Sequence, residues 1–133
     1  MKQLRDLSTP DSYIYLASPY SGTDFGQELR YEHVKLAVKF AIEEHLAVYS
    51  PILHSHDLTK TYQLPGDAAY WELVNSGFIN NCSELWVLML PGWEESRGIE
   101  LELQYARLLE KPVRFVYLPP TFDQLLVNEQ PGE

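Results

Sequence analysis

The sequence is poor in cysteine, since Cys82 is the single cysteine among 133 residues. One thiol excludes both an internal disulfide framework and a cysteine-based metal cluster. Long apolar runs are missing as well, and none approaches the roughly 20 residues needed to span a bilayer. The first residues, MKQLRDLS, do not resemble a signal peptide. We therefore expect a soluble, cytoplasmic protein without a membrane partner.

Basic residues are also few: 10 lysines and arginines stand against 19 aspartates and glutamates, which gives a net charge of −9. A surface that follows a nucleic-acid backbone needs a basic stripe, so this charge argues against a nucleic-acid polymer as partner. It leaves room for a small anionic ligand. Helix-terminal amides, a hydroxyl and one arginine can hold a phosphate on an otherwise acidic protein.

What the sequence does contain is an ordinary globular composition, with 45% hydrophobic residues. Its length fits one domain, which we place at residues 13–118, between a loose N-terminal arm (1–12) and a C-terminal tail (119–133). The expected strands are 13–17, 46–50, 85–90 and 112–118. The expected helices are 27–44, 68–82, 96–110 and a short one at 122–127, and residues 52–65 are expected to form a long loop.

The alternation of strands and helices predicts an α/β fold, doubly wound in three layers around a small parallel sheet of four or five strands. In such folds a ligand binds beyond the carboxyl ends of the strands. The loops that follow the predicted strands, among them 18–22, 50–56 and 90–98, all lie at that edge. We therefore expect a ligand site there.

Glu102 stands out in the helix predicted at 96–110. The solvated stripe of that helix consists of Glu100, Gln104, Arg107 and Lys111. At about 100° per residue, Glu102 falls roughly 200° away from Glu100, among apolar neighbours. Either it lies half exposed at the edge of the apolar face beside a cation, or it faces a cleft in which burial raises its pKa.

The start of the same helix suits an anion. Ser96 can cap the helix, Gly98 lets a ligand approach the backbone, and the helix dipole favours negative charge. Glu102 lies about 6–9 Å further along the axis, which is close to the distance from the 5′-phosphate of a nucleotide to its anomeric carbon. These residues together predict that Ser96 and Gly98 hold a phosphate or sugar while Glu102 faces C1′.

Other candidate binding residues come earlier in the chain. The turn after the first strand offers the hydroxyls of Ser18 and Ser21 and the ring of Tyr20. These groups suit a sugar or a base edge, although a plain turn has the same composition. Arg30, near the start of the next helix, is either an anion partner or a solvated surface residue.

The segment His54-Ser55-His56-Asp57 offers two imidazoles and a carboxylate, a set that can bind a divalent ion. No third histidine follows at ligand spacing, so we expect no metal. His54 is then either a substrate-lining residue or part of a structural loop. Glu72 and Asn75, three apart on one helix face, either orient a base or sugar or face solvent.

These residues carry a family resemblance. The stretch GIELELQYA, in which Glu102 follows Gly98 by four residues, resembles the nucleophile helix of nucleoside 2-deoxyribosyltransferases. The spacing from Ser96 through Gly98 to Glu102 resembles that of the related 2′-deoxynucleoside 5′-monophosphate N-glycosidases. Three further stretches, IYLASPY, YSPILHSH and ELWVLMLPGWEESRG, resemble a small bacterial branch of the same superfamily. The resemblance covers residues 13–117.

The resemblance implies a flavodoxin-like or Rossmann-like sheet, no cofactor and a retaining cleavage of an N-glycosidic bond. Glu102 attacks C1′ and expels the base, Ser96 binds the phosphate, and water or an acceptor base resolves the glycosyl-enzyme. An aspartate of the family that helps to protonate the leaving base is matched here by Asn75, and an amide cannot deliver a proton. Glu72, one turn earlier, is a candidate replacement.

Members of that superfamily complete their sites across a subunit interface, so a homodimer or larger homo-oligomer is implied. Trp93 and Tyr105 are candidate interface residues, and Trp93 is also a candidate substrate contact. The first functional hypothesis is therefore a nucleoside or nucleotide N-glycosidase or deoxyribosyltransferase. The alternatives are a catalytically diverged nucleotide-binding module and a protein-interaction domain. The base, the sugar and the choice between hydrolysis and transfer stay open.

Overall fold

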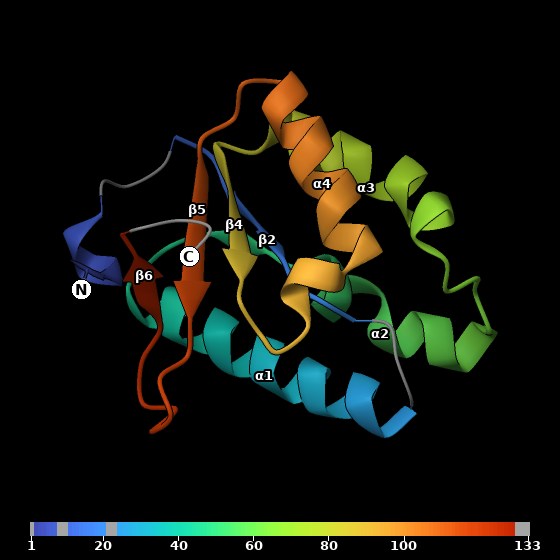
Figure 1. Cartoon of the computed structure of the whole chain (residues 1–133), viewed down its shortest axis with the longest axis horizontal. Coiled ribbons are helices and arrows are strands. Elements are labelled where there is room, and N and C mark those ends of the chain that lie inside the picture. Colours follow the sequence, from blue (N-terminus) through green and yellow to red (C-terminus); the bar gives the residue numbers. More distant parts are fainter. Residues whose placement is uncertain (1, 8–10, 21–23, 130–133) are drawn as a thin grey trace.

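The computed structural model describes residues 2–7, 11–20 and 24–129, which form a mixed sheet between two layers of helices (Figure 1). The strands are β1 (Lys2–Gln3), β2 (Ile14–Ala17), β3 (Val48–Tyr49), β4 (Glu84–Leu88), β5 (Val113–Tyr117) and β6 (Leu126–Asn128). Their order in the sheet is β1-β6-β5-β4-β2-β3. The strands β3, β2, β4 and β5 are mutually parallel, whereas β6 is antiparallel to both β5 and β1. The predicted three-layer α/β class is confirmed.

The α-helices of the described chain are α1 (Asp24–Glu43), α2 (Pro51–Tyr62), α3 (Ala68–Asn81) and α4 (Arg97–Leu108). Two short 3-10 helices, η1 (Leu4–Asp6) and η2 (Trp93–Glu95), complete the set. In Figure 1, α1 crosses one face of the sheet, and α3 and α4 lie over the other face. None of the helices in the described ranges is both long and apolar enough to cross a membrane.

The central strands supply two hydrophobic cores, one on each face of the sheet. Leu16 and Trp86 pack in the core under α1, whereas Tyr15 and Val87 pack in the core under α3 and α4. This division follows from the two-residue period of a strand. Because β4 is covered on both faces, its residues 85–88 are hydrophobic without alternation, as the sequence shows.

The winding of the chain places a ligand position at the ends of β2 and β4. β2 lies between β3 and β4, so the chain first adds a strand on one side of β2 and then crosses to the other side. In open α/β sheets the crevice at such a reversal, beyond the carboxyl ends of the strands, is where ligands bind. Here those ends are Ala17 and Leu88.

Three helices that begin at this edge are capped by side chains. Ser50 caps α2, Asp67 caps α3 and Ser96 caps α4, and each accepts a hydrogen bond of 3.2 Å from a backbone amide three residues later. Such caps stabilise a helix start by about 1 kcal/mol each. They fix where each helix begins, and therefore which of its residues face the edge of the sheet.

Three local predictions were wrong. The expected loop at 52–65 is mostly the helix α2, whose start carries the signature of a serine cap followed by Pro51 in the first turn. No helix forms at 122–127, where the last residues belong to the strand β6 instead, and the arm expected to be loose contributes β1, which pairs with β6. The parallel sheet is therefore extended by β6, which runs antiparallel to β5, and by β1, which runs antiparallel to β6.

Candidate functional site

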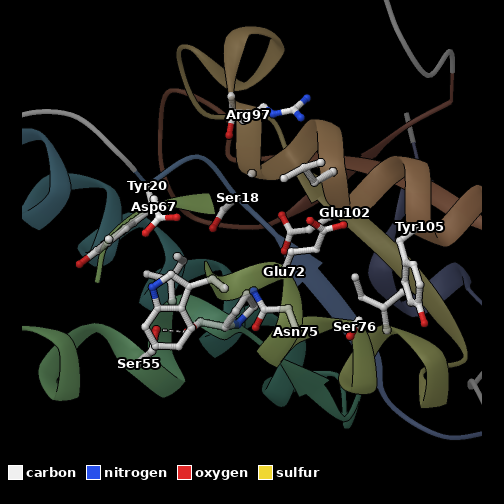
Figure 2. Close-up of a pocket in the computed structure, with 18 of the residues that line it drawn as sticks. Ser18, Tyr20, Ser55, Asp67, Glu72, Asn75, Ser76, Arg97, Glu102 and Tyr105 are labelled. Carbon is white, nitrogen blue, oxygen red and sulfur yellow. Dashed lines mark hydrogen bonds between the residues drawn. The ribbon is translucent and has the colours of Figure 1, made fainter. Parts of the chain in front are cut away.

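A pocket of about 330 Å³ opens at the carboxyl ends of β2 and β4 (Figure 2). Its walls come from the segment after β2, from α2, from α3 and from α4. This volume lies at the lower end of the range usual for small-molecule sites. The lining includes Ser18, Tyr20, Asn75, Ser96, Gly98 and Glu102, which are six of the residues that the sequence singles out.

Glu102 is the most perturbed carboxylate of the pocket. It lies on α4, and its Oε2 atom accepts a hydrogen bond of 2.5 Å from the Tyr15 hydroxyl. Burial raises the pKa of Glu102 from 4.5 to about 7, although the hydrogen bond from Tyr15 acts in the opposite direction. Burial and the nearby Glu102 charge hold the pKa of Tyr15 well above its usual value. Tyr15 therefore stays a proton-bearing donor at neutral pH.

Two buried polar side chains line the pocket without a hydrogen-bond partner in the part of the chain that the structure describes. Ser18 is 6% exposed and Asn75 is 9% exposed. The Ser18 Oγ is buried without a hydrogen bond, and the Asn75 carboxamide makes none to the residues that the structure describes. Because an unpaired buried polar group costs about 1–3 kcal/mol, both groups are poised to bond a ligand or water in the pocket.

The start of α4 presents an open backbone to the pocket. The Ser96 Oγ accepts from the Ile99 amide at 3.2 Å, and its own hydroxyl hydrogen is left to donate. A Cβ atom at Gly98 would meet only the Ser96 Oγ, at 3.8 Å, so the space in front of this residue is free. Arg97 also lines the pocket and pairs with Glu100 at 2.9 Å.

Acidic groups outnumber basic ones in the pocket lining. The carboxylates are those of Asp67, Glu72 and Glu102, and Arg97 is the cation among the described lining residues. Asp67 is occupied as the cap of α3, through the Tyr70 amide. Glu72 is exposed and forms no hydrogen bond or ion pair with the described residues. The lining is thus acidic, with its cation at the start of α4.

The wall formed by α2 contains a polar network that sequence reasoning missed. The Tyr20 hydroxyl lies 2.5 Å from Nδ1 of His56, and Nε2 of His56 lies 3.1 Å from a Glu28 oxygen. His56 is 2% exposed and stacks on Tyr31, with the ring centroids 4.0 Å apart. Glu28 is also paired with Lys60, and the hydrogen bond from Lys60 is the main reason that the pKa of Glu28 is lowered. The network ties α2 to α1 and fixes the ring of Tyr20.

Three predicted binding residues lie away from the pocket. The Arg30 guanidinium donates to the Pro91 carbonyl at 3.0 Å and so tethers the loop after β4. His54 lies beside Tyr49 and Phe78, with ring centroids 5.7 and 5.9 Å away. Trp93 packs on Phe115 at 5.5 Å. None of the three is a lining residue, and the predicted Ser21 lies outside the described residues.

The two histidines suspected of binding a metal face different neighbours. His56 bonds to Tyr20 and Glu28, whereas His54 lies by the aromatic rings of Tyr49 and Phe78. Within the described ranges, no three histidine, cysteine or acidic side chains gather closely enough to hold an ion.

The contacts of Tyr15 with Glu102, and of His56 with Tyr20 and Glu28, are not evident from the sequence. Tyr15 sits in a short, fully buried strand and looks like an ordinary core residue. His56 lies in the segment expected to be a loop, but this segment forms α2. As part of α2, it shares a helix with Ile52, Ser55 and Thr59, which line the pocket at three- and four-residue spacing.

Comparison with known proteins places the chain in a family. No curated protein matches the chain. A family model described as a domain of unknown function (DUF1937) matches residues 12–118, which include every strand of the parallel sheet and all of the pocket walls. The chain therefore belongs to the DUF1937 family.

Proposed function

We propose that this protein cleaves the N-glycosidic bond of a nucleoside or nucleotide, with Glu102 as the nucleophile. The observation that carries the proposal is the position of Glu102, a desolvated carboxylate on the wall of a ligand-sized pocket, with one oxygen held by Tyr15. A desolvated carboxylate is costly to keep in a folded protein, and one at a pocket wall is a candidate for a functional role. The sequence resemblance supports the same assignment.

The proposed reaction is a double displacement. Glu102 attacks C1′ through an oxocarbenium-like transition state and the base leaves; water or an acceptor base then attacks C1′ and frees the carboxylate. Tyr15 orients the nucleophile, because its hydrogen bond holds Oε2 and leaves Oε1 for the substrate. It also stabilises the carboxylate as the leaving group of the second step.

The polar groups of the pocket suit the parts of such a substrate. The backbone at Gly98, the Ser96 hydroxyl and Arg97 form the end that favours a phosphate or a 5′-hydroxyl. The unpaired Ser18 hydroxyl and Asn75 carboxamide offer hydrogen bonds to a sugar and to the edge of a base. Because the rest of the lining is acidic, a phosphate would bind only at the start of α4, where the backbone amides and Arg97 offset the negative charge.

The test is base release from a panel of nucleosides, deoxynucleosides and their 5′-monophosphates, with and without acceptor bases, followed by chromatography. We expect one class to be cleaved, and Glu102→Gln to lower kcat by about 10⁴-fold or more, as loss of a nucleophile does. Glu95→Gln is the matched control, since Glu95 is exposed in η2 and lies outside the pocket lining. Equal activity of Glu102→Gln and wild type would exclude the proposal.

A second candidate function, nucleotide binding without turnover, is favoured by Asn75. A carboxamide at this buried position binds a ligand but cannot transfer a proton. This reading predicts a thermal shift with a nucleotide and no base release. If an Asn75→Asp variant then gains activity, the protein is a binding module derived from an enzyme; if no nucleotide shifts the unfolding temperature, both nucleotide hypotheses fail.

The proposal includes a cytoplasmic homo-oligomer, as the resemblance implies. The exposed leucines Leu73 on α3 and Leu108 on α4, at 82% and 77% exposure, provide apolar surface for a second copy. Tyr105 lines the pocket from α4, so an interface here would adjoin the site. Sedimentation of the wild type and of Leu108→Glu tests this, and a monomeric wild type contradicts it.

A further inference from the structure

Breaking a C–N glycosidic bond leaves an electron pair on a ring nitrogen of the base, and this nitrogen needs a proton unless the base is already activated. We propose that Glu72 supplies that proton and later accepts one from the attacking water. The inference rests on the proposed function. Asn75 also lines the pocket, but its carboxamide cannot supply a proton.

The pocket contains few other groups that can exchange a proton. Asp67 accepts a hydrogen bond from the Tyr70 amide as the cap of α3, and Glu102 is the proposed nucleophile. The Tyr20 hydroxyl is held by His56 at 2.5 Å. Tyr105 is a phenol, and phenols release a proton far less readily than carboxylic acids. Glu72 is the remaining carboxyl group of the described lining.

The position of Glu72 fits the role. It precedes Asn75 by three residues on α3, so the two share one helix face, and both line the pocket. Figure 2 shows Glu72 from α3 and Glu102 from α4 turned into the same hollow, with Asn75 beside them. The Glu72 carboxyl group is exposed and makes no hydrogen bond or ion pair with the described residues, so both of its oxygens are open to a substrate.

In the proposed reaction one proton passes from Glu72 to the base and a second returns to Glu72 from water. Glu102 forms a bond to C1′ as the C1′–N bond breaks, its electron pair goes to the ring nitrogen, and the proton of the Glu72 carboxyl group moves to that nitrogen. In the second step the Glu72 carboxylate takes a proton from water, the water oxygen bonds to C1′, and the Glu102–C1′ bond breaks. The net reaction consumes one water and returns both carboxyl groups to their starting states.

The experiment compares 2′-deoxyguanosine with 7-methyl-2′-deoxyguanosine, or their 5′-monophosphates, in the wild type and in Glu72→Gln. The methylated base carries a positive charge and departs without being protonated. We expect Glu72→Gln to lower kcat by about 10²–10⁴-fold on the ordinary substrate, and by less than about 10-fold on the methylated one. A merely structural residue would affect both substrates equally. Glu95→Gln is again the exposed control.

The outcomes separate the two proposals. If the wild type cleaves both substrates and Glu102→Gln cleaves neither, but Glu72→Gln behaves as the wild type, the role of Glu72 is overturned and the nucleophile stands. A loss on the ordinary substrate alone in Asp67→Asn or Tyr105→Phe, and not in Glu72→Gln, moves the role to that residue. If the wild type releases no base from either substrate or from any other member of the nucleoside panel, the proposed function fails, and the role of Glu72 fails with it.

Discussion

Two walls of the same pocket, one from α4 and one from α2, differ in how their polar groups are occupied. On α4, Glu102 has Tyr15 as its one side-chain partner among the described residues, and the backbone at Gly98 is open. On the α2 side, Tyr20, His56 and Glu28 are bound to one another. Polar groups that hydrogen-bond to one another stabilise the fold, whereas polar groups without such partners can bind or react with a ligand. We therefore assign the chemistry to the α4 wall and a supporting role to the α2 wall.

The largest expected effect on stability concerns the charge of Glu102. Its pKa is raised from 4.5 to about 7, so the folded protein holds a proton there that the unfolded chain releases. The contribution of Glu102 to stability is then greatest below about pH 4.5 and declines as the pH rises through about 7. Glu102→Gln lacks this charge, and its amide oxygen can still accept the Tyr15 hydrogen bond. At 1.36 kcal/mol per pKa unit, the variant should be about 3 kcal/mol more stable than wild type above pH 7.

Urea unfolding of the wild type and Glu102→Gln at about pH 4 and pH 8 measures this difference. The two proteins should agree closely at the lower pH and diverge at the higher one. Glu95→Gln should follow the wild type at both, because Glu95 is exposed. If the difference in the free energy of unfolding between wild type and Glu102→Gln is the same at both pH values, Glu102 ionises as an ordinary surface carboxylate. The two walls of the pocket would then not differ in the way we infer.

A matched pair of variants tests the two walls directly. Tyr15→Phe removes the hydrogen bond that lowers the Glu102 pKa, so this pKa should rise above 7 and fewer nucleophiles should be ionised at neutral pH. We expect kcat/KM to fall by about 10²-fold, and its acidic limb to move to higher pH, since a charge-assisted hydrogen bond is worth about 1.5–3 kcal/mol.

His56→Leu removes the partner of both Tyr20 and Glu28 on the other wall. Because two polar groups lose a buried contact, we expect the free energy of unfolding to fall by about 2 kcal/mol, with kcat of the folded protein within a few-fold of wild type. Kinetics and urea unfolding of both variants check the pair. Should His56→Leu lower kcat as much as Tyr15→Phe, the α2 wall takes part in the chemistry.

The sequence predicted the α4 wall because its signals are local. A serine cap, a glycine two residues on and a carboxylate on the apolar side of one helix all fall within Ser96 to Glu102, and the strand before them is the most apolar run in the chain. The parallel sheet followed from the alternation of strand and helix patterns along the chain, which are local signals too.

What could not be predicted depends on contacts between distant parts of the chain. Tyr15 and Glu102 are 87 positions apart, and nothing in a four-residue buried strand marks one tyrosine as a hydrogen-bond donor to a carboxylate. β1 has two residues and β6 has three, too few to show a periodic pattern, and they form because they pair with each other and with β5. In α2, polar residues hid the helical spacing, and Pro51 resembled the end of a strand rather than the first turn of a helix.

The smallest expected effect belongs to Gly98→Ala, which sharpens the assignment of the open end of α4. Alanine is tolerated there, because its Cβ would lie 3.8 Å from the Ser96 Oγ and meet nothing closer, and alanine favours a helix over glycine. The free energy of unfolding should therefore rise by about 0.5 kcal/mol. If a phosphate binds at this backbone, the added methyl group should weaken the binding of a 5′-monophosphate by about 10-fold, or ~1.4 kcal/mol. The affinity for the nucleoside should stay unchanged. Calorimetric titration with both ligands measures the ratio. An equal loss for both would mean that Gly98 faces the sugar, and that the substrate of the α4 wall is an unphosphorylated nucleoside.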